Sequence, residues 1–167
     1  RRFDWSVISP TIFGAVFEST LNPETRRSGG MHYTSIANIH KVIDPLFLDD
    51  LKKEFEKIIL VPDCEKYMSR RRETTLRYDY REKLDAFHRK LASLSFLDPA
   101  CGSGNFLTET FLSLRRLENR LIAEMTGGQQ ILGDMVNPIR VSIRQFYGIE
   151  INDFAVTVAK TALWIAE

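Results

Sequence analysis

The chain has 167 residues, of which 44% are hydrophobic and 27% charged, and its formal net charge is +1. That length suits one domain with its own core and a helical extension. No apolar run approaches the roughly 20 residues of a membrane-spanning helix, and no signal peptide is apparent, so we expect a cytoplasmic protein without a membrane partner. Cys64 and Cys101 have no CxxC partner, so we expect neither a zinc site nor a disulfide framework.

The first 94 residues predict helices. Ser9 and Pro10 are typical of a helix start, and a helix over 9–21 would bury one apolar face, made of Ile12, Phe13, Val16 and Phe17. A second helix is predicted to begin near Thr34 or Ser35 and to end at Pro45. Its buried side would consist of Ile36, Ile39, Val42 and Ile43.

Helical spacing resumes over 46–60, and residues 65–94 predict a charged helix. The apolar stripe of that helix consists of Leu84, Phe87, Leu91 and Leu94. The run SRRRE over 69–73 could contact DNA phosphates, but an exposed helical face is the simpler interpretation. His40 and His88 fall in helical patterns and are expected at the surface or its boundary.

From residue 95 the hydrophobic period changes. The pattern predicts a buried strand over 95–100, a long amphipathic helix over 105–125 and a loop-like stretch over 126–145. A second strand over 146–151 and a helix capped by Asn152 and Asp153 follow. This order predicts an α/β fold in which a helical region, 1–94, precedes the first half of a doubly wound sheet, 95–167. Because the chain lacks an initial Met and ends inside an apolar helical pattern, we expect it to be part of a longer protein.

The stretch FLDPACGSGNFL, residues 96–107, places Gly102 and Gly104 between the first strand and the helix after it. Glycine lets a ligand approach the backbone closely, and the helix start offers free amide groups. A dinucleotide site fits poorly, because Leu107 stands where a third glycine belongs and the acidic Asp98 would repel phosphate. An amino acid group fits better, with its ammonium near Asp98 and its carboxylate near the helix start.

The stretch YGIEIND places Glu150 at the carboxyl end of the second strand, where an acid can bind the two hydroxyls of a ribose. Ile151 would then lie beside the adenine ring. The distance from the glycine turn exceeds the usual gap of about 20 residues, so an insertion must precede this strand. An amino acid at one end and adenosine at the other describe S-adenosylmethionine.

Three segments resemble motifs of DNA methyltransferases that modify the exocyclic amine of adenine, in particular MmeI-like enzymes that combine methylation and restriction or belong to related defence systems. FLDPACGSGNFL resembles their cofactor-binding motif, FYGIEINDFAVTVAKTALWIAE their second motif, and GGMHYTSIANIHKVIDPLFLDDL the motif that precedes both. The resemblance implies a Rossmann-like methyltransferase fold and S-adenosylmethionine as cofactor. Its double-stranded DNA partner would bind through parts of the parent protein outside this chain.

The resemblance also implies roles for single residues. Tyr33 and Thr34 would contact the methionine end of the cofactor, and Phe106 would form a pocket wall. The expected cofactor-binding residues are Tyr33, Thr34, Asp98, Pro99, Ala100, Cys101, Gly102, Gly104, Asn105, Phe106, Glu150 and Ile151. Cys101 is expected to be a small side chain under the cofactor and not a nucleophile.

The family's catalytic signature is Asn-Pro-Pro followed by an aromatic residue. This chain has VNPIR, in which Ile139 replaces the second proline and no aromatic residue follows, and the segment precedes the second strand. We therefore interpret Asn137 and Pro138 as a loop turn, assign no catalytic residue, and expect the chain alone to be inactive. In the complete enzyme the target adenine would be flipped out of the duplex for direct methyl transfer.

Other functions remain open from the sequence. The chain could be a non-catalytic cofactor-sensing or docking module, or belong to a methyltransferase acting on RNA or protein. A nicotinamide-dependent dehydrogenase is disfavoured by Asp98 and Leu107. The sequence predicts neither a DNA target, nor a nuclease, nor an oligomeric state.

Overall fold

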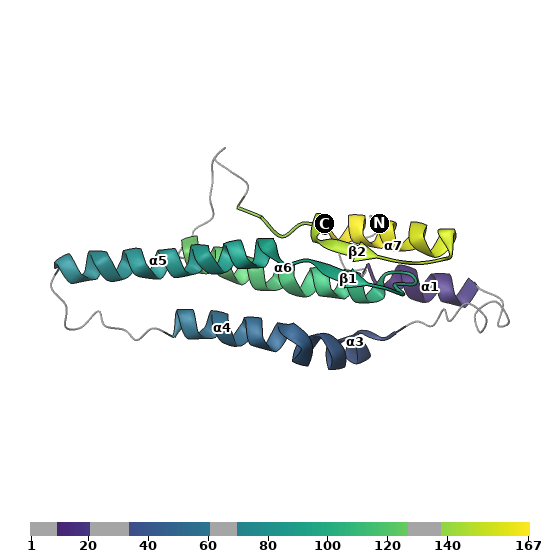
Figure 1. Cartoon of the computed structure of the whole chain (residues 1–167), viewed down its shortest axis with the longest axis horizontal. Coiled ribbons are helices and arrows are strands. Elements are labelled where there is room, and N and C mark those ends of the chain that lie inside the picture. The colour runs from purple at the N-terminus through teal and green to yellow at the C-terminus, as the bar shows by residue number, and fades with distance from the viewer. Residues whose placement is uncertain (1–9, 21–33, 61–69, 127–137) are drawn as a thin grey trace, which may run out of the picture.

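Helices dominate the computed structural model, which describes residues 10–20, 34–60, 70–126 and 138–167 (Figure 1). The α-helices are α1 (Ile12–Thr20), α3 (Ile36–Ile43), α4 (Asp49–Ile59), α5 (Arg70–Ser93), α6 (Asn105–Thr126) and α7 (Asp153–Ala166). A π-helical segment, η2 (Asp44–Leu48), joins α3 to α4, and a 3-10 turn, η4 (Ile143–Gln145), precedes the second strand. In the described residues, no helix is long and apolar enough to cross a membrane.

The strands β1 (Phe96–Asp98) and β2 (Phe146–Gly148) pair in parallel, with Phe96 opposite Phe146. Both strands are shorter than predicted, although backbone bonding continues beyond them at the Asp98–Ile149 and Cys101–Ile149 contacts. The inner face of this small sheet carries stacked rings of Phe96 and Phe146, with centroids 5.2 Å apart.

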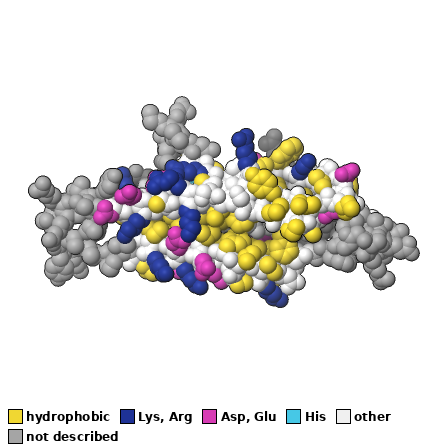
Figure 2. All heavy atoms as spheres, in the orientation of Figure 1, with side chains coloured by type: hydrophobic (Ala, Val, Ile, Leu, Met, Phe, Trp, Pro, Cys, Tyr) yellow, Lys and Arg dark blue, Asp and Glu magenta, His cyan; other side chains and the backbone are white. Residues whose placement is uncertain are grey.

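The opposite face of the sheet is open. Leu97 is 63% exposed and Tyr147 is 56% exposed, because side chains alternate between the two faces of a strand. Figure 2 shows hydrophobic side chains gathered over the half of the molecule that contains the strands, whereas more of the charged side chains lie over α4 and α5.

The main core lies around α6, which packs against α3, α5, α7 and both strands. Its buried residues come from both halves of the sequence: Leu51, Phe55, Leu84, Phe87, Leu91, Leu107, Phe111, Leu114, Leu117, Leu121, Val141, Phe146 and Leu163. Leu84, Phe87 and Leu91 confirm the predicted stripe of α5, and Leu94 packs against the core while partly buried. Each such side chain contributes about 1.5–3 kcal/mol through burial.

Pro45 was predicted to end the second helix, but the chain stays helical through this residue. The α-helix ends at Ile43, but the chain continues as the wider π-helical turn, in which Asp49 donates its backbone N–H to the Asp44 carbonyl. Proline lacks a backbone N–H, so the wider turn lets the helix continue without that donor. The predicted buried face is also only half right, because Ile39 and Ile43 are buried while Ile36 and Val42 are exposed.

Two of the four residues predicted on the buried face of the first helix, Ile12 and Val16, are instead exposed. Among the described residues of this segment, Gly14 of α1 and Thr11, just before the helix, are buried. A Cβ at Gly14 would lie 2.3 Å from Asn105 Oδ1 and 2.7 Å from Ser103 Oγ, so α1 approaches the start of α6 through its smallest residue. Ser9 lies outside the described residues, as do the side chains of Phe13 and Phe17.

His88 is buried, contrary to the prediction of a surface or boundary position. It is 2% exposed, and its Nε2 lies 2.7 Å from Oε1 of the fully buried Glu118. The same oxygen accepts the backbone N–H groups of Arg140 and Val141, at 2.7 and 2.9 Å. Through these contacts Glu118, a residue of α6, connects the segment before β2 to α5 and α6.

Candidate functional site

The predicted glycine turn lies between β1 and α6 and is held by hydrogen bonds within the turn. Asp98 Oδ1 accepts the backbone N–H of Ala100 at 3.1 Å, and the Cys101 carbonyl accepts the N–H of Gly104 at 2.8 Å. Cys101 also donates its N–H to the Ile149 carbonyl, at 3.0 Å, so the turn is bound to the chain that leaves β2. Parallel strands bring their carboxyl ends to one edge, and the two predicted segments meet there.

The two glycines of the turn serve different purposes. Both have positive φ, +53° at Gly102 and +77° at Gly104, which favours glycine. A Cβ at Gly104 would lie 2.7 Å from the Cβ of Ala159, so this glycine lets α7 pack against the turn. A Cβ at Gly102 would meet no atom of the described residues within 4 Å, so these residues leave the backbone there open to a ligand.

Glu150 lies directly against this turn. Its Oε2 accepts the backbone N–H of Gly102 at 2.9 Å, across 48 residues of sequence. Its Oε1 accepts the N–H groups of Ile151 and Asn152, at 2.8 and 2.9 Å. A carboxylate offers about four acceptor positions, so Oε2 keeps roughly one for a further donor. The structure therefore brings Glu150, Gly102 and Asp98 to one edge of the sheet.

The other predicted residues of the turn lie around this group. Pro99 and Ala100 are exposed, and Ile151 is 95% exposed directly after Glu150. Asn105, the first residue of α6, is buried beneath α1. These positions give the turn an open side at Ala100 and Gly102 and a covered side at Asn105.

Cys101 packs inward and is not activated as a nucleophile. A Cβ at Gly148 would lie 2.6 Å from Cys101 Sγ, so any larger residue at this position of β2 would collide with the thiol. Burial raises the pKa of the Cys101 thiol most, and the negative charges of Asp98 and Glu150 raise it further. A thiol in this setting stays protonated at neutral pH.

The preceding motif reaches the same region through α3. Ser35 caps this helix and accepts the N–H of Asn38 at 3.4 Å, while Thr34 is half-buried just before it. Phe106, in the first turn of α6, packs against the cluster of Ile39, Ile43 and Leu48. Tyr33 lies outside the described residues.

The segments VNPIR and SRRRE, to which the sequence assigned no site role, are described only in part. Pro138 and Ile139 have no regular secondary structure, as expected for a loop, and Asn137 lies outside the described residues. Arg70, Arg71 and Arg72 are helical within α5, but their side chains are not described.

Sequence reasoning missed several residues that shape the site. Gly14, Gly148 and Ala159 act by being small where a backbone or side chain comes close, and nothing in the sequence pattern marks them. His40 and Glu109 were also missed, and together they connect α3 to α6 with Nε2 and Oε1 3.1 Å apart.

Comparisons with known proteins match this chain to methyltransferases. Residues 74–167 match the family model described as MmeI, DNA-methyltransferase domain. DNA methyltransferase A of Bacillus subtilis (strain 168) is 42% identical over 164 residues, covering 98% of this chain and 16% of that protein. The adenine-specific methyltransferase PglX of Streptomyces coelicolor is 35% identical over 74 residues, covering 44% of this chain and 5% of that protein.

A solved structure gives the same result. The Type IIL restriction-modification enzyme MmeI, solved in complex with DNA, matches with a TM-score of 0.79 and 45% identity over 98% of this chain. This chain covers 19% of that enzyme, and so spans less than a fifth of either long relative. The chain belongs to the MmeI DNA-methyltransferase domain family, as the resemblance of its three motifs predicted.

Proposed function

We propose that this chain is the S-adenosylmethionine-binding part of an adenine-specific DNA methyltransferase from a restriction–modification or related defence system. The observation that carries the proposal is the contact between Gly102 and Glu150, which joins an open backbone turn to a strand-end carboxylate. The printed names of the relatives support the class of reaction, since they include DNA methyltransferases, an adenine-specific methyltransferase and a restriction–modification enzyme.

The residues present fit the two ends of this cofactor. The space beside Gly102 would admit the amino acid portion, and Asp98, whose Oδ1 accepts the N–H of Ala100 in the same turn, would attract its ammonium. The remaining acceptor position of Glu150 Oε2 would take one ribose hydroxyl, and a second would compete with the Gly102 N–H for the same carboxylate. Ile151 would offer an apolar surface to the adenine. When bound, the cofactor supplies the activated methyl group.

A Rossmann-like domain is the fold that best accounts for the small sheet. Its strands are parallel and joined through α6, as in the first unit of a doubly wound sheet. The exposed face at Leu97 and Tyr147 is the one on which such a sheet carries its second layer of helices.

Binding of the target and catalysis are assigned to other parts of the protein. The described residues of VNPIR lie in the segment held by Glu118, and the sequence has no Asn-Pro-Pro-aromatic signature. This chain would therefore bind and orient the cofactor, while the positioning of the adenine amine for attack, which supplies much of the rate, depends on residues outside it.

Calorimetric titration of the intact protein tests the proposal. S-adenosylhomocysteine, the demethylated product, should bind far more tightly than NAD, and Glu150→Gln should weaken it. Glu54→Gln makes the same chemical change at an exposed pair with Lys90 and should leave the affinity unchanged. Tighter binding of NAD, or equal loss in both variants, would contradict the assignment.

A further inference from the structure

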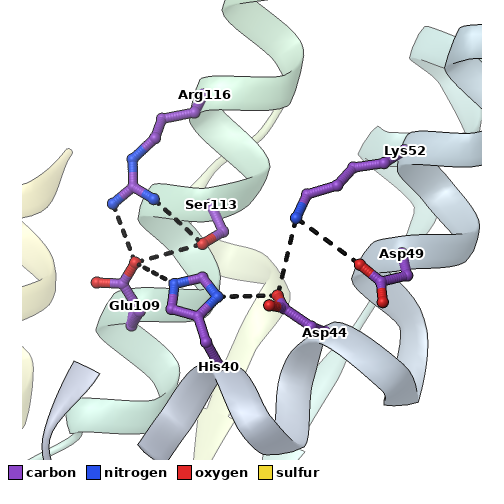
Figure 3. A network of polar contacts seen from close by, with 7 residues as sticks. All are labelled: His40, Asp44, Asp49, Lys52, Glu109, Ser113 and Arg116. Atoms are coloured by element: carbon purple, nitrogen blue, oxygen red, sulfur yellow. Dashed lines mark hydrogen bonds and ion pairs between the residues drawn. The ribbon is translucent and has the colours of Figure 1, made fainter. Parts of the chain in front are cut away.

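His40 bridges two carboxylates, one through each ring nitrogen (Figure 3). Its Nδ1 lies 2.8 Å from Asp44 Oδ1, and its Nε2 lies 3.1 Å from Glu109 Oε1. Ionised carboxylates only accept hydrogen bonds, and a neutral imidazole can donate only one. Both contacts are therefore satisfied only when the ring carries two protons and a positive charge.

The surrounding charges favour that protonated form. The groups near the ring come from three elements: Asp44 from η2, Asp49 and Lys52 from α4, and Glu109, Ser113 and Arg116 from α6 (Figure 3). Three carboxylates face two permanent cations here, so the cluster is neutral only when His40 is charged. The hydrogen bond with Asp44 raises the pKa of His40 most, burial opposes it, and Glu109 adds to the increase.

Glu109 depends on this bridge because it is almost completely buried. Its side chain is 1% exposed, and a buried carboxylate is costly unless it is paired. Oε1 also accepts from Arg116 Nη2 at 3.0 Å and from Ser113 Oγ at 3.4 Å, but these groups belong to α6 itself. Among the described residues, His40 is the ionic partner of Glu109 that lies on another helix.

The bridge joins the two halves of the proposed cofactor site. Glu109 lies one turn after Asn105, where the glycine turn enters α6, and His40 lies in the helix that follows Thr34 and Ser35. Phe106 packs against α3 on the same side of α6. The two helices therefore meet through an apolar contact and through the ionic bridge.

We propose that His40 is a positioning residue, whose imidazolium fastens α3 to α6 and so holds the Thr34 region against the glycine turn in the geometry that binds cofactor. This inference rests on the proposed function. It predicts that cofactor affinity depends on the protonation of a side chain that does not touch the cofactor.

The test measures the affinity of the intact protein for S-adenosylhomocysteine between pH 6 and pH 9. The ligand's own amine titrates in this range, so the informative quantity is the ratio of the Kd of His40→Gln to that of the unmodified protein. Glutamine keeps a donor but cannot carry charge. The ratio should be about 5- to 20-fold at pH 6 and should approach one at pH 9.

Two further variants make the result specific. Asp44→Asn removes the negative charge of one of the two bridged carboxylates and should move the decline in affinity to lower pH. His88→Gln disturbs the buried contact with Glu118, away from the bridge, and should lower stability while leaving the pH dependence of affinity unchanged. If His40→Gln does not fold, the shift in Asp44→Asn alone decides the question.

The outcomes separate this inference from the proposed function. A ratio near one at every pH, a constant ratio above one, or an unshifted Asp44→Asn profile would overturn the positioning role while leaving cofactor binding intact. Failure of the unmodified protein to bind S-adenosylhomocysteine at any pH would overturn the proposed function, and the positioning role with it.

Discussion

Gly102 donates its backbone N–H to Glu150 Oε2 at 2.9 Å, and this bond connects the turn after the first strand to the end of the second. The two residues are 48 positions apart. Glu150 also accepts from Ile151 and Asn152, so it organises the loop in addition to any ligand that it holds. A substitution at Glu150 therefore acts on both binding and stability.

Replacing Glu150 with Ala should weaken the binding of S-adenosylhomocysteine about 10- to 150-fold, if the carboxylate makes a charge-assisted bond of about 1.5–3 kcal/mol to the ribose. The sequence alone predicts little change in the melting temperature. The structure instead predicts a decrease, because the N–H groups of Gly102, Ile151 and Asn152 lose their acceptor.

Glu150→Gln should have an affinity and a melting temperature between those of Glu150→Ala and the unmodified protein. Its amide oxygen can keep accepting from Ile151 and Asn152. Calorimetry and thermal unfolding measure the two effects separately. An affinity for S-adenosylhomocysteine unchanged in Glu150→Ala would exclude Glu150 as the ribose ligand.

Alanine at Gly102 should mainly weaken cofactor binding, whereas alanine at Gly104 should mainly lower stability. Gly102→Ala should cost only the strain of a positive φ, about 1–2 kcal/mol of unfolding free energy, while its methyl group obstructs the space proposed for the cofactor. Gly104→Ala adds a collision with Ala159 and should cost about 2–5 kcal/mol. Urea unfolding and titration with S-adenosylhomocysteine distinguish them, and full affinity in a folded Gly102→Ala would refute the proposed location.

Acid should lower the free energy of unfolding by protonating Glu118. Burial raises the pKa of this carboxyl most, but bonds from Arg140, His88, Val141 and Arg115 together hold the pKa below its ordinary 4.5. A lowered pKa means that the stabilisation is present above pH 4.5 and is lost as the pH falls through the lowered value. Unfolding free energies measured from pH 7 to pH 3 should show this loss.

Glu118→Gln should lower the stability at pH 7 by about 3–5 kcal/mol and flatten the acid dependence. Glu124→Gln, on the exposed side of α6, is the matched control and should change the stability by less than about 1 kcal/mol. Equal effects of the two variants would show that the Glu118 contacts do not hold the segment before β2.

The chain alone should not methylate DNA, because it lacks the Asn-Pro-Pro-aromatic signature. Incubation with S-adenosylmethionine carrying a labelled methyl group and DNA of mixed sequence provides the measurement. Label incorporated into adenine would show that VNPIR or another segment performs the chemistry, and that its interpretation as a loop turn is wrong.

The sequence predicted those features that depend on local pattern. Hydrophobic spacing located α6 to within one residue at its end, and the polar residues Ser35 and Asn152 marked helix starts that the structure confirms. The residues of the turn and Glu150 were identified from chemistry at strand ends, and the structure brings them together.

Features that depend on neighbours distant in sequence were beyond local pattern. Gly14 of α1 lies against Asn105 of α6, a contact that the apolar spacing of α1 does not predict, and Ile12 and Val16 are exposed despite that spacing. The burial of His88 follows from Glu118, 30 residues away, and the bridge at His40 from Glu109 on another helix. Pro45 was expected to stop a helix because a π-helical continuation has no distinct sequence pattern.

A crystal structure of the intact protein with S-adenosylhomocysteine tests the central claim most directly. The amino acid group of the ligand should lie beside Gly102 and Asp98, and a ribose hydroxyl should lie within hydrogen-bond distance of Glu150 Oε2, about 2.5–3.0 Å. A ligand bound elsewhere, or a ribose that leaves Glu150 bonded only to its three backbone donors, would contradict it.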